Sequence, residues 1–332
     1  MTEPRFVVLM PVLNDWANAA SVLAEVDSTF SARGWAGSAL IVDDGSSENA
    51  APLDFSPASL QTVEVIRLRR NLGHQRAISV GLCHLERSKT GAHVIVMDGD
   101  GQDAPADIPA LVEEFERHAG RRVVFAGRTK RPEGSLFKAF YWLYRVLHRL
   151  LTGRTIRVGN FSVLPGRAVG AITCSPDAWS HYAAAVYQTR LPVAVVDIAR
   201  AKRLKGPPKM KFVGLVTHGL AAIAVFGDIV SVRLLIAAAA ASLAAGVLVV
   251  AAWVAVATEA VEWAAGGVWA AAAALILLTQ LNVGALVVGF LIHRGRRAAP
   301  VIPRRDFEHF IDRVEHWSGR GITPRSGASA SA

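Results

Sequence analysis

The sequence predicts an α/β domain built on a mostly parallel sheet, followed by two membrane-spanning helices. Over residues 1 to about 130, short apolar runs alternate with helix-like stretches, and polar clusters follow the apolar runs. Farther along, residues 234–257 and 264–292 are two long runs without a charged residue, each long enough to cross a bilayer. Buried helices of a soluble core are the alternative, but the runs lack the polar face of an amphipathic helix.

The apolar runs mark the expected strands. They lie at residues 6–10, 39–42, 63–68, 94–97 and 123–126, with helical candidates near residues 17–32, 75–88 and 107–118 between them. Strands that alternate with helices pair in parallel. Ligands of open parallel sheets bind outside the carboxyl ends of the strands, so the residues just after each run are the candidates for a site.

Polar residues gather at these strand ends. After the first four runs come Pro11, Leu13, Asn14 and Asp15, then Asp43 and Asp44, then Asn71, then Asp98 to Asp103. Each cluster alone is also a good turn sequence, because Asp, Asn and Gly supply side-chain caps and positive φ. Two acidic clusters at corresponding strand ends favour a function. A calcium loop of the EF-hand type is excluded, since it needs Gly at the position of Asp103 and Glu at that of Pro109.

Asp98 and Asp100 are the candidate metal ligands. They are separated by Gly99, which we expect to let the backbone turn so that both carboxylates face one point. Carboxylate oxygens suit Mg²⁺ or Mn²⁺, and such an ion neutralises a leaving nucleoside diphosphate. Asp43 and Asp44 are then expected to hydrogen-bond the nucleoside. The residues therefore indicate metal-assisted transfer from a nucleotide-activated donor.

Charge sets the expected location. Basic residues precede the first apolar run and follow the second, whereas the connection carries Glu259 and Glu262. The positive-inside rule then predicts a multi-pass protein of the cell (inner) membrane with both termini cytoplasmic. The first residues do not form a signal peptide, and two cysteines provide neither a disulfide framework nor a cysteine metal site. We assign the net charge of +9 to contact with anionic membrane lipid rather than nucleic acid.

These observations divide the chain into four parts. Residues 1–209 form the catalytic α/β domain, 210–228 interfacial helices, 229–292 the two transmembrane helices and 293–332 a basic cytoplasmic tail. His218 is expected to be an interfacial contact rather than a metal ligand, and residues 322–332 to be disordered. Gln280 and Asn282 lie inside the second span, where they would hydrogen-bond between helices or subunits of a homo-oligomer, or simply pack.

Six motifs, in this order and spacing, resemble the family 2 glycosyltransferases of GT-A fold. They are PVLND at 11–15, VDDGS at 42–46, NLGHQRAISVGL at 71–82, DGDGQDAP at 98–105, GRTKRPEGSLFKAFYWL at 127–143 and RLKGPPKM at 203–210. Within that family the chain is similar to the polyprenyl-phosphate glycosyltransferases, the group of dolichol-phosphate mannose synthase and undecaprenyl-phosphate glucosyltransferase. Three departures stand out: Asp15 replaces a Glu, Pro208 and Met210 alter the last motif, and Asn160 stands where the family often has Asp.

The resemblance implies an inverting hexosyltransferase (EC 2.4). It would move a sugar from a UDP- or GDP-hexose to a polyprenyl phosphate, of undecaprenyl or dolichyl type, at the cytoplasmic membrane face. The catalytic residues would be Asp98, Asp100, Asp103, Arg128 and Asn160, with Mg²⁺ or Mn²⁺ on Asp98 and Asp100. The donor would contact Pro11, Leu13, Asn14, Asp15, Asp43, Asp44, Asn71, Asp98, Gly99 and Gln102, and the acceptor phosphate Arg128, Arg131, Ser135, Arg203 and Lys209.

Two alternatives stay open, and Asn160 supports one of them, a non-enzymatic protein. An amide cannot take up a proton, but a lipid phosphate is mostly ionised at neutral pH and needs no general base, so we expect an active enzyme. A non-enzymatic membrane subunit that kept the fold is one alternative. A processive polysaccharide synthase is the other, although two spans are too few for a pore. The motifs leave the sugar, nucleotide, polyprenol, pathway and oligomeric state undetermined.

Overall fold

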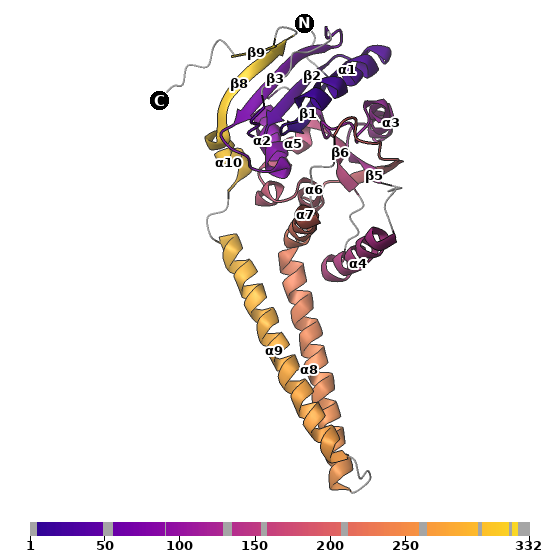
Figure 1. Ribbon diagram of the computed structural model, residues 1–332, viewed down its shortest axis with the longest axis vertical. Coiled ribbons are helices and arrows are strands. Elements are labelled where there is room, and N and C mark those ends of the chain that lie inside the picture. Colours follow the sequence, from indigo (N-terminus) through magenta and orange to yellow (C-terminus); the bar gives the residue numbers. More distant parts are fainter. Residues whose placement is uncertain are drawn as a thin grey trace. The chain divides into compact units, whose positions relative to one another are not determined.

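The computed structural model divides the chain into two compact units. An α/β unit comprises Met1–Ser135, Ile156–Val225 and Val301–Ala332, and a helical unit comprises Leu136–Thr155 and Phe226–Pro300 (Figure 1). The structure describes residues 5–48, 56–89, 91–128, 135–153, 158–206, 212–258, 264–297, 301–318 and 321–324. Each unit is described by itself.

The α/β unit is organised around one mixed sheet of nine strands in the order β7-β5-β6-β4-β1-β2-β3-β8-β9. The strands are β1 (Phe6–Val12), β2 (Gly37–Asp43), β3 (Leu60–Leu68), β4 (His93–Val96), β5 (Val123–Arg128), β6 (Val158–Leu164), β7 (Val193–Ile198), β8 (Ile311–Ser318) and β9 (Gly321–Pro324). The central strands β3, β2, β1 and β4 are parallel neighbours, and of the described strands only β6 and β8 run against the rest. This arrangement confirms the α/β class and the five strands expected from the apolar runs.

Helices cover both faces of the sheet. Helices α1 (Trp16–Ala32) and α3 (Ile108–Arg117) pack in one apolar cluster, and α2 (His74–Arg87), α5 (Gly166–Thr173) and α6 (Tyr182–Gln188) pack in the other. Strand β1 is buried along its whole length because it supplies side chains to both clusters. A strand buried on both faces shows an uninterrupted apolar run, which is why the sequence predicted the central strands. Helices α1, α2 and α3 correspond to the three helical candidates between those runs.

The segment after the long helices returns to the sheet. It forms α10 (Pro303–Asp306), a 3₁₀ turn (Phe307–Phe310) and β8, which pairs antiparallel with β3. Residues 293–332 were predicted to be a basic tail, a prediction that includes neither this helix nor these strands. Strand β8 reads IDRVEHWS, and a strand with polar residues among its apolar ones lacks the uninterrupted run that marks a strand buried on both faces. Residues 322–324, expected to be disordered, lie in β9, and residues 325–332 lie outside the described part.

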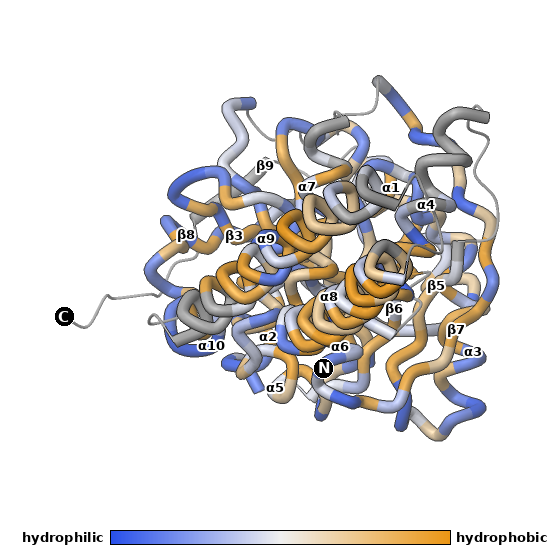
Figure 2. The backbone as a smooth tube through the Cα atoms, turned by 90° about the horizontal axis from the view of Figure 1, so that it is seen from below, coloured by the Kyte–Doolittle hydropathy of each residue, from blue (hydrophilic) through white to orange (hydrophobic). Residues whose placement is uncertain are grey.

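Two helices of the helical unit are long and apolar enough to cross a membrane. Helices α8 (Gly227–Ala257) and α9 (Ala264–Arg297) contain the segments Gly227–Ala255 and Trp269–Gly289, with mean hydropathy 2.5 and 2.1. Figure 2 shows both as predominantly hydrophobic. Helix α4 (Ser135–Thr152) belongs to this unit for most of its length, whereas α7 (Phe212–Ala224), within the segment expected to lie at the membrane interface, belongs to the α/β unit.

Asn282 joins the two long helices. Its side-chain amide on α9 donates to the carbonyl oxygen of Ala238 on α8 at 3.1 Å and to the hydroxyl of Ser242. The expectation of a hydrogen bond between helices is confirmed for this residue, whereas Gln280 is exposed. In a membrane such a bond holds a helical hairpin together.

A first prediction concerns this hairpin. Replacing Asn282 by Leu removes the donor to α8 and should destabilise the hairpin by about 1 kcal/mol. The thermal unfolding temperature of the detergent-purified protein should fall as a result. Gln280→Leu, two residues away and exposed, is the matched control and should leave the unfolding temperature unchanged. Equal effects of the two substitutions would contradict a role for the Asn282 hydrogen bonds.

A second prediction concerns Asp27, a buried carboxylate of α1. Its oxygens accept backbone N–H bonds from Ala58, Ser59 and Leu60 at 2.8–3.2 Å, which fixes the entry into β3. Asp27→Ala leaves these donors unsatisfied and should destabilise the α/β unit by roughly 2–4 kcal/mol. The measurement is chemical denaturation followed by tryptophan fluorescence, with the exposed Glu25→Ala on the same helix as control.

Candidate active site

The candidate site lies at the carboxyl ends of the central strands. Strands β1, β2, β3 and β4 are parallel neighbours, so the loops that follow them emerge at one edge of the sheet. These loops carry Asn14 and Asp15, Asp43 and Asp44, Asn71, and Asp98 to Asp103. The structure thus brings the sequence-predicted donor and metal residues of the α/β unit to the same edge.

The loop after β4 folds on its own carboxylates. The backbone N–H of Asp98 donates to Oδ2 of Asp103 at 2.9 Å, and that of Gln102 donates to Oδ1 of Asp100 at 3.0 Å. Gly99 lies in a turn, as expected, whereas the positive φ of this loop, +81°, falls at Gly101. Gly99 is also closely packed, since a Cβ there would lie 2.8 Å from the sulfur of Met10.

Asp100 is held in a charged environment. Burial and the neighbouring carboxylate of Asp98 raise the pKa of Asp100, while the Gln102 N–H and the nearby guanidinium groups of Arg203 and Arg200 lower it, with a net rise. A carboxylate whose charge is disfavoured in this way gains from any cation placed against it. This is the electrostatic condition expected of a metal ligand.

Arg203 is the cation that meets Asp100 in the structure. Its guanidinium donates to Oδ2 of Asp100 at 3.0 Å and also contacts the carboxylate of Asp15, so it links the loops after β4 and β1. The backbone N–H of Leu204 donates to the carbonyl oxygen of Asp100 at 3.1 Å. Arg203, expected at the acceptor phosphate, therefore lies against the donor and metal residues.

Asn160, on β6, contacts the loop after β4 directly. We call this loop, which carries the candidate metal ligands Asp98 and Asp100, the metal loop. Its side-chain N–H donates to Oδ1 of Asp98 at 3.2 Å, and its oxygen accepts from Nε2 of Gln75 at 3.0 Å. Oε1 of Gln75 in turn accepts the backbone N–H of Tyr182 at 2.6 Å. Gln75 was not predicted as a site residue, although it lies inside the NLGHQ motif that was singled out. An amide at position 160 can donate to Asp98, which an ionised carboxylate could not do.

Asn14 and Asp43 join the loops after β1 and β2. We call these the donor loops, because they carry residues predicted to contact the donor. Oδ1 of Asn14, a residue with φ +49°, accepts from the backbone N–H groups of Ser47 and Glu48 at 2.8 and 3.2 Å. Oδ1 of Asp43 accepts the N–H of Ser46 at 3.0 Å, and its Oδ2 pairs with Arg67 at 2.6 Å. The loops after β1 and β2 therefore form one hydrogen-bonded unit.

The side chain of Asp44 is buried and holds the NLG loop, residues 71–73, through backbone hydrogen bonds. It is 2% exposed, and its two oxygens accept the backbone N–H groups of Leu72 and Gly73 at 2.6 and 2.9 Å. Burial raises the pKa of Asp44, and the two N–H groups only partly offset that rise. Its contact with a nucleoside stays a prediction, while its structural role is direct.

The other predicted residues vary in their placement. Pro11 and Gly99 are buried, Leu13 and Gln102 are half-buried and Asn71 is exposed. Arg128 ends β5 and Ser135 begins α4, but their side chains are outside the described part, as are Arg131 and Lys209 altogether. Four of the five residues expected at the acceptor phosphate are thus untested by the geometry.

A small hollow lies beside Gln102 and Asp103. Asp107 and Arg200 also line it, and burial raises the pKa of Asp107. The rest of its lining includes the apolar side chains of Ala126, Phe161 and Ile198. That Gln102 and Asp103 face a sugar stays a prediction.

His218 of α7 packs against two other histidine rings. Its ring centroid lies 4.4 Å from that of His181 and 5.4 Å from that of His74. Nevertheless, among the described residues no group of three or more His, Cys, Asp or Glu side chains is arranged to hold a metal ion. The expectation that His218 makes an interfacial polar contact stays a prediction.

Asp98 and Asp100 fit a magnesium or manganese ion that is completed by substrate. Such ions are bound in phosphate-transferring sites by one or two carboxylates together with phosphate oxygens and water, not by a full protein cage. The structure supplies two carboxylates close enough for Asp98 to raise the pKa of Asp100. The donor set therefore fits a divalent ion that arrives with a nucleoside diphosphate.

Solved structures with a similar fold include glucosyl-3-phosphoglycerate synthase from Mycobacterium tuberculosis. Its complex with Mn²⁺ and UDP-glucose is 16% identical, with a TM-score of 0.48 over 68% of this chain and 79% of that chain. Its complex with phosphoglyceric acid is 17% identical, with a TM-score of 0.46 over 68% of this chain and 80% of that chain.

Curated relatives are more similar to the chain in sequence. Two proteins of Klebsiella pneumoniae strains, both named undecaprenyl-phosphate 4-deoxy-4-formamido-L-arabinose transferase, are 30% and 29% identical over 151 residues, 45% of this chain. The match spans 44% of the length of each relative. The family model described as glycosyl transferase family 2 matches residues 8–168, from β1 through β6. On these residues, which carry the metal loop, both donor loops and Asn160, the chain belongs to glycosyl transferase family 2.

Proposed function

We propose that the protein transfers a hexose from a UDP- or GDP-sugar to a polyprenyl phosphate at the cytoplasmic face of a membrane, with inversion at the anomeric carbon. The observation that carries the proposal is the pairing of Asp98 and Asp100 at the same sheet edge as two hydrogen-bonded donor loops. Membership of the family and the names of the undecaprenyl-phosphate transferases support it.

The residues divide the work between donor and metal. Asp98 and Asp100 would hold Mg²⁺ or Mn²⁺, which supplies Lewis-acid stabilisation of the leaving nucleoside diphosphate. Asn160 holds Asp98 in place through its 3.2 Å hydrogen bond, and Asp103 holds the backbone of Asp98 through a second one. The loops after β1 and β2 bind the nucleoside, and Gln102 faces the sugar.

No protein base is required for the attack. A phosphate monoester has a second pKa near 6, so its oxygen is already a nucleophile at neutral pH. Asn160 is therefore a positioning residue for the metal ligand and not a proton acceptor. Catalysis rests on charge stabilisation at the leaving group.

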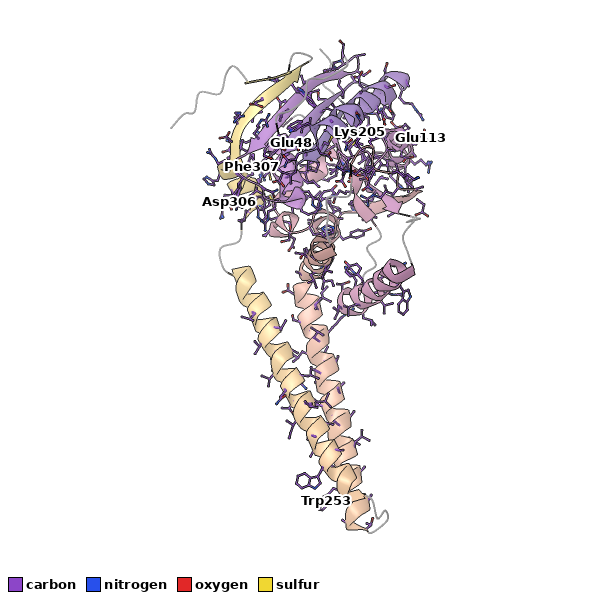
Figure 3. All side chains as sticks on the ribbon, in the orientation of Figure 1. Glu48, Glu113, Lys205, Trp253, Asp306 and Phe307 are labelled. Carbon is purple, nitrogen blue, oxygen red and sulfur yellow. The ribbon has the colours of Figure 1, made fainter. Side chains whose placement is uncertain are left out.

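The helical unit supports a lipid acceptor. Trp253 and Trp269, near the ends of α8 and α9 that face their connection, are 63% and 78% exposed, and Figure 3 shows Trp253 projecting from α8. Tryptophan is enriched where a span meets the membrane surface. Helix α4 also exposes Trp142 and Leu150. Two apolar helices with such flanks suit a protein anchored beside its lipid substrate. The proposed contacts of the acceptor phosphate are Arg128, Arg131, Ser135 and Lys209.

The test is transfer of radiolabel from a panel of UDP- and GDP-sugars to undecaprenyl phosphate by the detergent-purified full chain. We expect label in the lipid phase, lost with EDTA and restored by Mn²⁺. Asp100→Ala removes a metal ligand and should lower transfer by about 100-fold or more. Glu113→Ala, an exposed carboxylate of α3, is the control and should leave transfer unchanged.

Two results would count against the proposal. Transfer that survives both EDTA and Asp100→Ala would exclude the metal role. Binding of nucleotide and metal without transfer to any lipid phosphate would favour a non-enzymatic subunit that kept the fold.

A fourth prediction separates the positioning role of Asn160 from a base. Asn160→Asp replaces the amide donor beside Asp98 by a second negative charge, so transfer at pH 7.5 should fall by roughly 10- to 100-fold. The two carboxylates would share a proton with a raised pKa, so the ratio of variant to wild-type rate should increase as the pH falls. A variant faster than the wild type at pH 7.5 would instead indicate that a base had been restored.

A further inference from the structure

The C-terminal strand brings a buried charge to the donor side of the sheet. Strand β8 lies antiparallel beside β3, with Glu315 opposite Val65 (Figure 1). Phe307, labelled in Figure 3 at the start of this segment, is 2% exposed in one apolar cluster, and Trp317 is 4% exposed in the other. The segment is therefore anchored on both faces of the sheet.

Glu315 is unusual for a carboxylate because it is only 5% exposed. Its Oε2 accepts from Nε of Arg67 at 2.9 Å and its Oε1 accepts from Nε of Arg313 at 2.6 Å. Burial raises the pKa of Glu315, but the hydrogen bonds from Arg313 and Arg67 outweigh it and the net shift is downward. Buried ion pairs contribute little net stability compared with apolar packing, so stability alone does not account for this one.

Arg67 connects Glu315 to Asp43, the last residue of β2. Its guanidinium contacts Glu315 on one side and Oδ2 of Asp43, at 2.6 Å, on the other, and it lies 5.4 Å from the ring centroid of Trp16. The ring of Trp16 meets Trp317 of β8 edge to face, 5.5 Å away. The guanidinium is thus held between two carboxylates and an aromatic ring.

Asp43 extends the connection to both donor loops. It accepts the N–H of Ser46 at 3.0 Å, and the hydroxyl of Ser46 accepts the N–H of Asn14 at 2.8 Å. An unbroken series of contacts therefore runs from Glu315 through Arg67, Asp43 and Ser46 to Asn14.

We propose that Glu315 is a positioning residue for the nucleotide of the donor, acting through Arg67 on Asp43 and the turn that follows it. The proposal rests on the proposed function, because it assumes that a nucleoside diphosphate binds these loops. The donor site is then complete only when the chain beyond α9 has returned to the sheet. Residues outside the matched span 8–168 thereby contribute to donor recognition.

The experiment measures nucleotide affinity and steady-state kinetics of the detergent-purified full chain. UDP and GDP, each with Mn²⁺, are titrated by calorimetry into the wild type, Glu315→Gln, Arg67→Gln and the double variant. Glu315→Gln keeps the shape but removes the charge that holds Arg67. It should weaken nucleotide binding and raise the donor KM by about tenfold, with kcat within about twofold of wild type.

The double variant tests the route of action. If Glu315 acts through Arg67, then Glu315→Gln should change affinity by less than about twofold when Arg67 is already Gln. The control is Glu308→Gln in the same segment, an exposed carboxylate paired with Arg87, which should bind nucleotide like the wild type. Should Glu315→Gln fail to fold, Glu315→Asp keeps the charge, shortens the reach to Arg67 and should give the same increase in donor KM.

The outcomes are distinct. Unchanged nucleotide affinity in Glu315→Gln, or equal effects in the wild-type and Arg67→Gln backgrounds, would overturn the positioning role while the proposed function stands. A wild type that binds neither nucleotide would overturn the proposed function, and the positioning role with it.

Discussion

The structure depends on neutralising a cluster of carboxylates that the parallel sheet concentrates at one edge. Six of them, Asp15, Asp43, Asp44, Asp98, Asp100 and Asp103, follow the strands β1, β2 and β4. Each has a partner: Arg203 for Asp15 and Asp100, Arg67 for Asp43, backbone N–H groups for Asp44 and Asp103, and Asn160 for Asp98. Buried charge without such partners would be prohibitively costly. The loops are therefore shaped by the contacts that satisfy these acids.

The partners come from widely separated parts of the chain. Arg203 lies beyond β7, Asn160 on β6, and Arg67 on β3, where Glu315 of β8 supports it. Hydrogen bonds and ion pairs fix the loops where we propose that a nucleotide binds, and two carboxylates remain where a divalent cation is expected. Asp100, whose pKa is raised by burial and by Asp98, is the clearest case, because it gains most from a divalent ion.

The central fold was predictable because its signal is local. Strands β1 to β4 are buried on both faces and show as apolar runs, and α8 and α9 show as long uncharged runs. Strands β7 and β8 and helix α4 escaped, since they bury one face only or mix polar with apolar residues. In β8 each apolar residue is followed by polar ones, so its sequence looks like an ordinary surface segment.

In the candidate site, too, residues in short motifs were predictable, whereas contacts between distant residues were not. Asp98, Asp100 and Asn14 could be found because they stand in short motifs directly after strands. The contacts of Arg203 with Asp100, of Gln75 with Asn160 and of Glu315 with Arg67 join residues 103, 85 and 248 positions apart, so no spacing in the sequence announces them. The positive φ at Gly101 could not be predicted because the two glycines of one motif look alike in sequence.

The most direct test of this account is the position of the metal. Crystals of the full chain grown with Mn²⁺ and a nucleoside diphosphate would give an anomalous difference map at the manganese absorption edge. The account predicts one strong peak in the α/β unit, within coordination distance of Asp98 or Asp100 and of the diphosphate, with the guanidinium of Arg203 displaced from Asp100. A peak elsewhere, or a nucleotide bound at the donor loops without manganese at the Asp98–Asp100 loop, would contradict it.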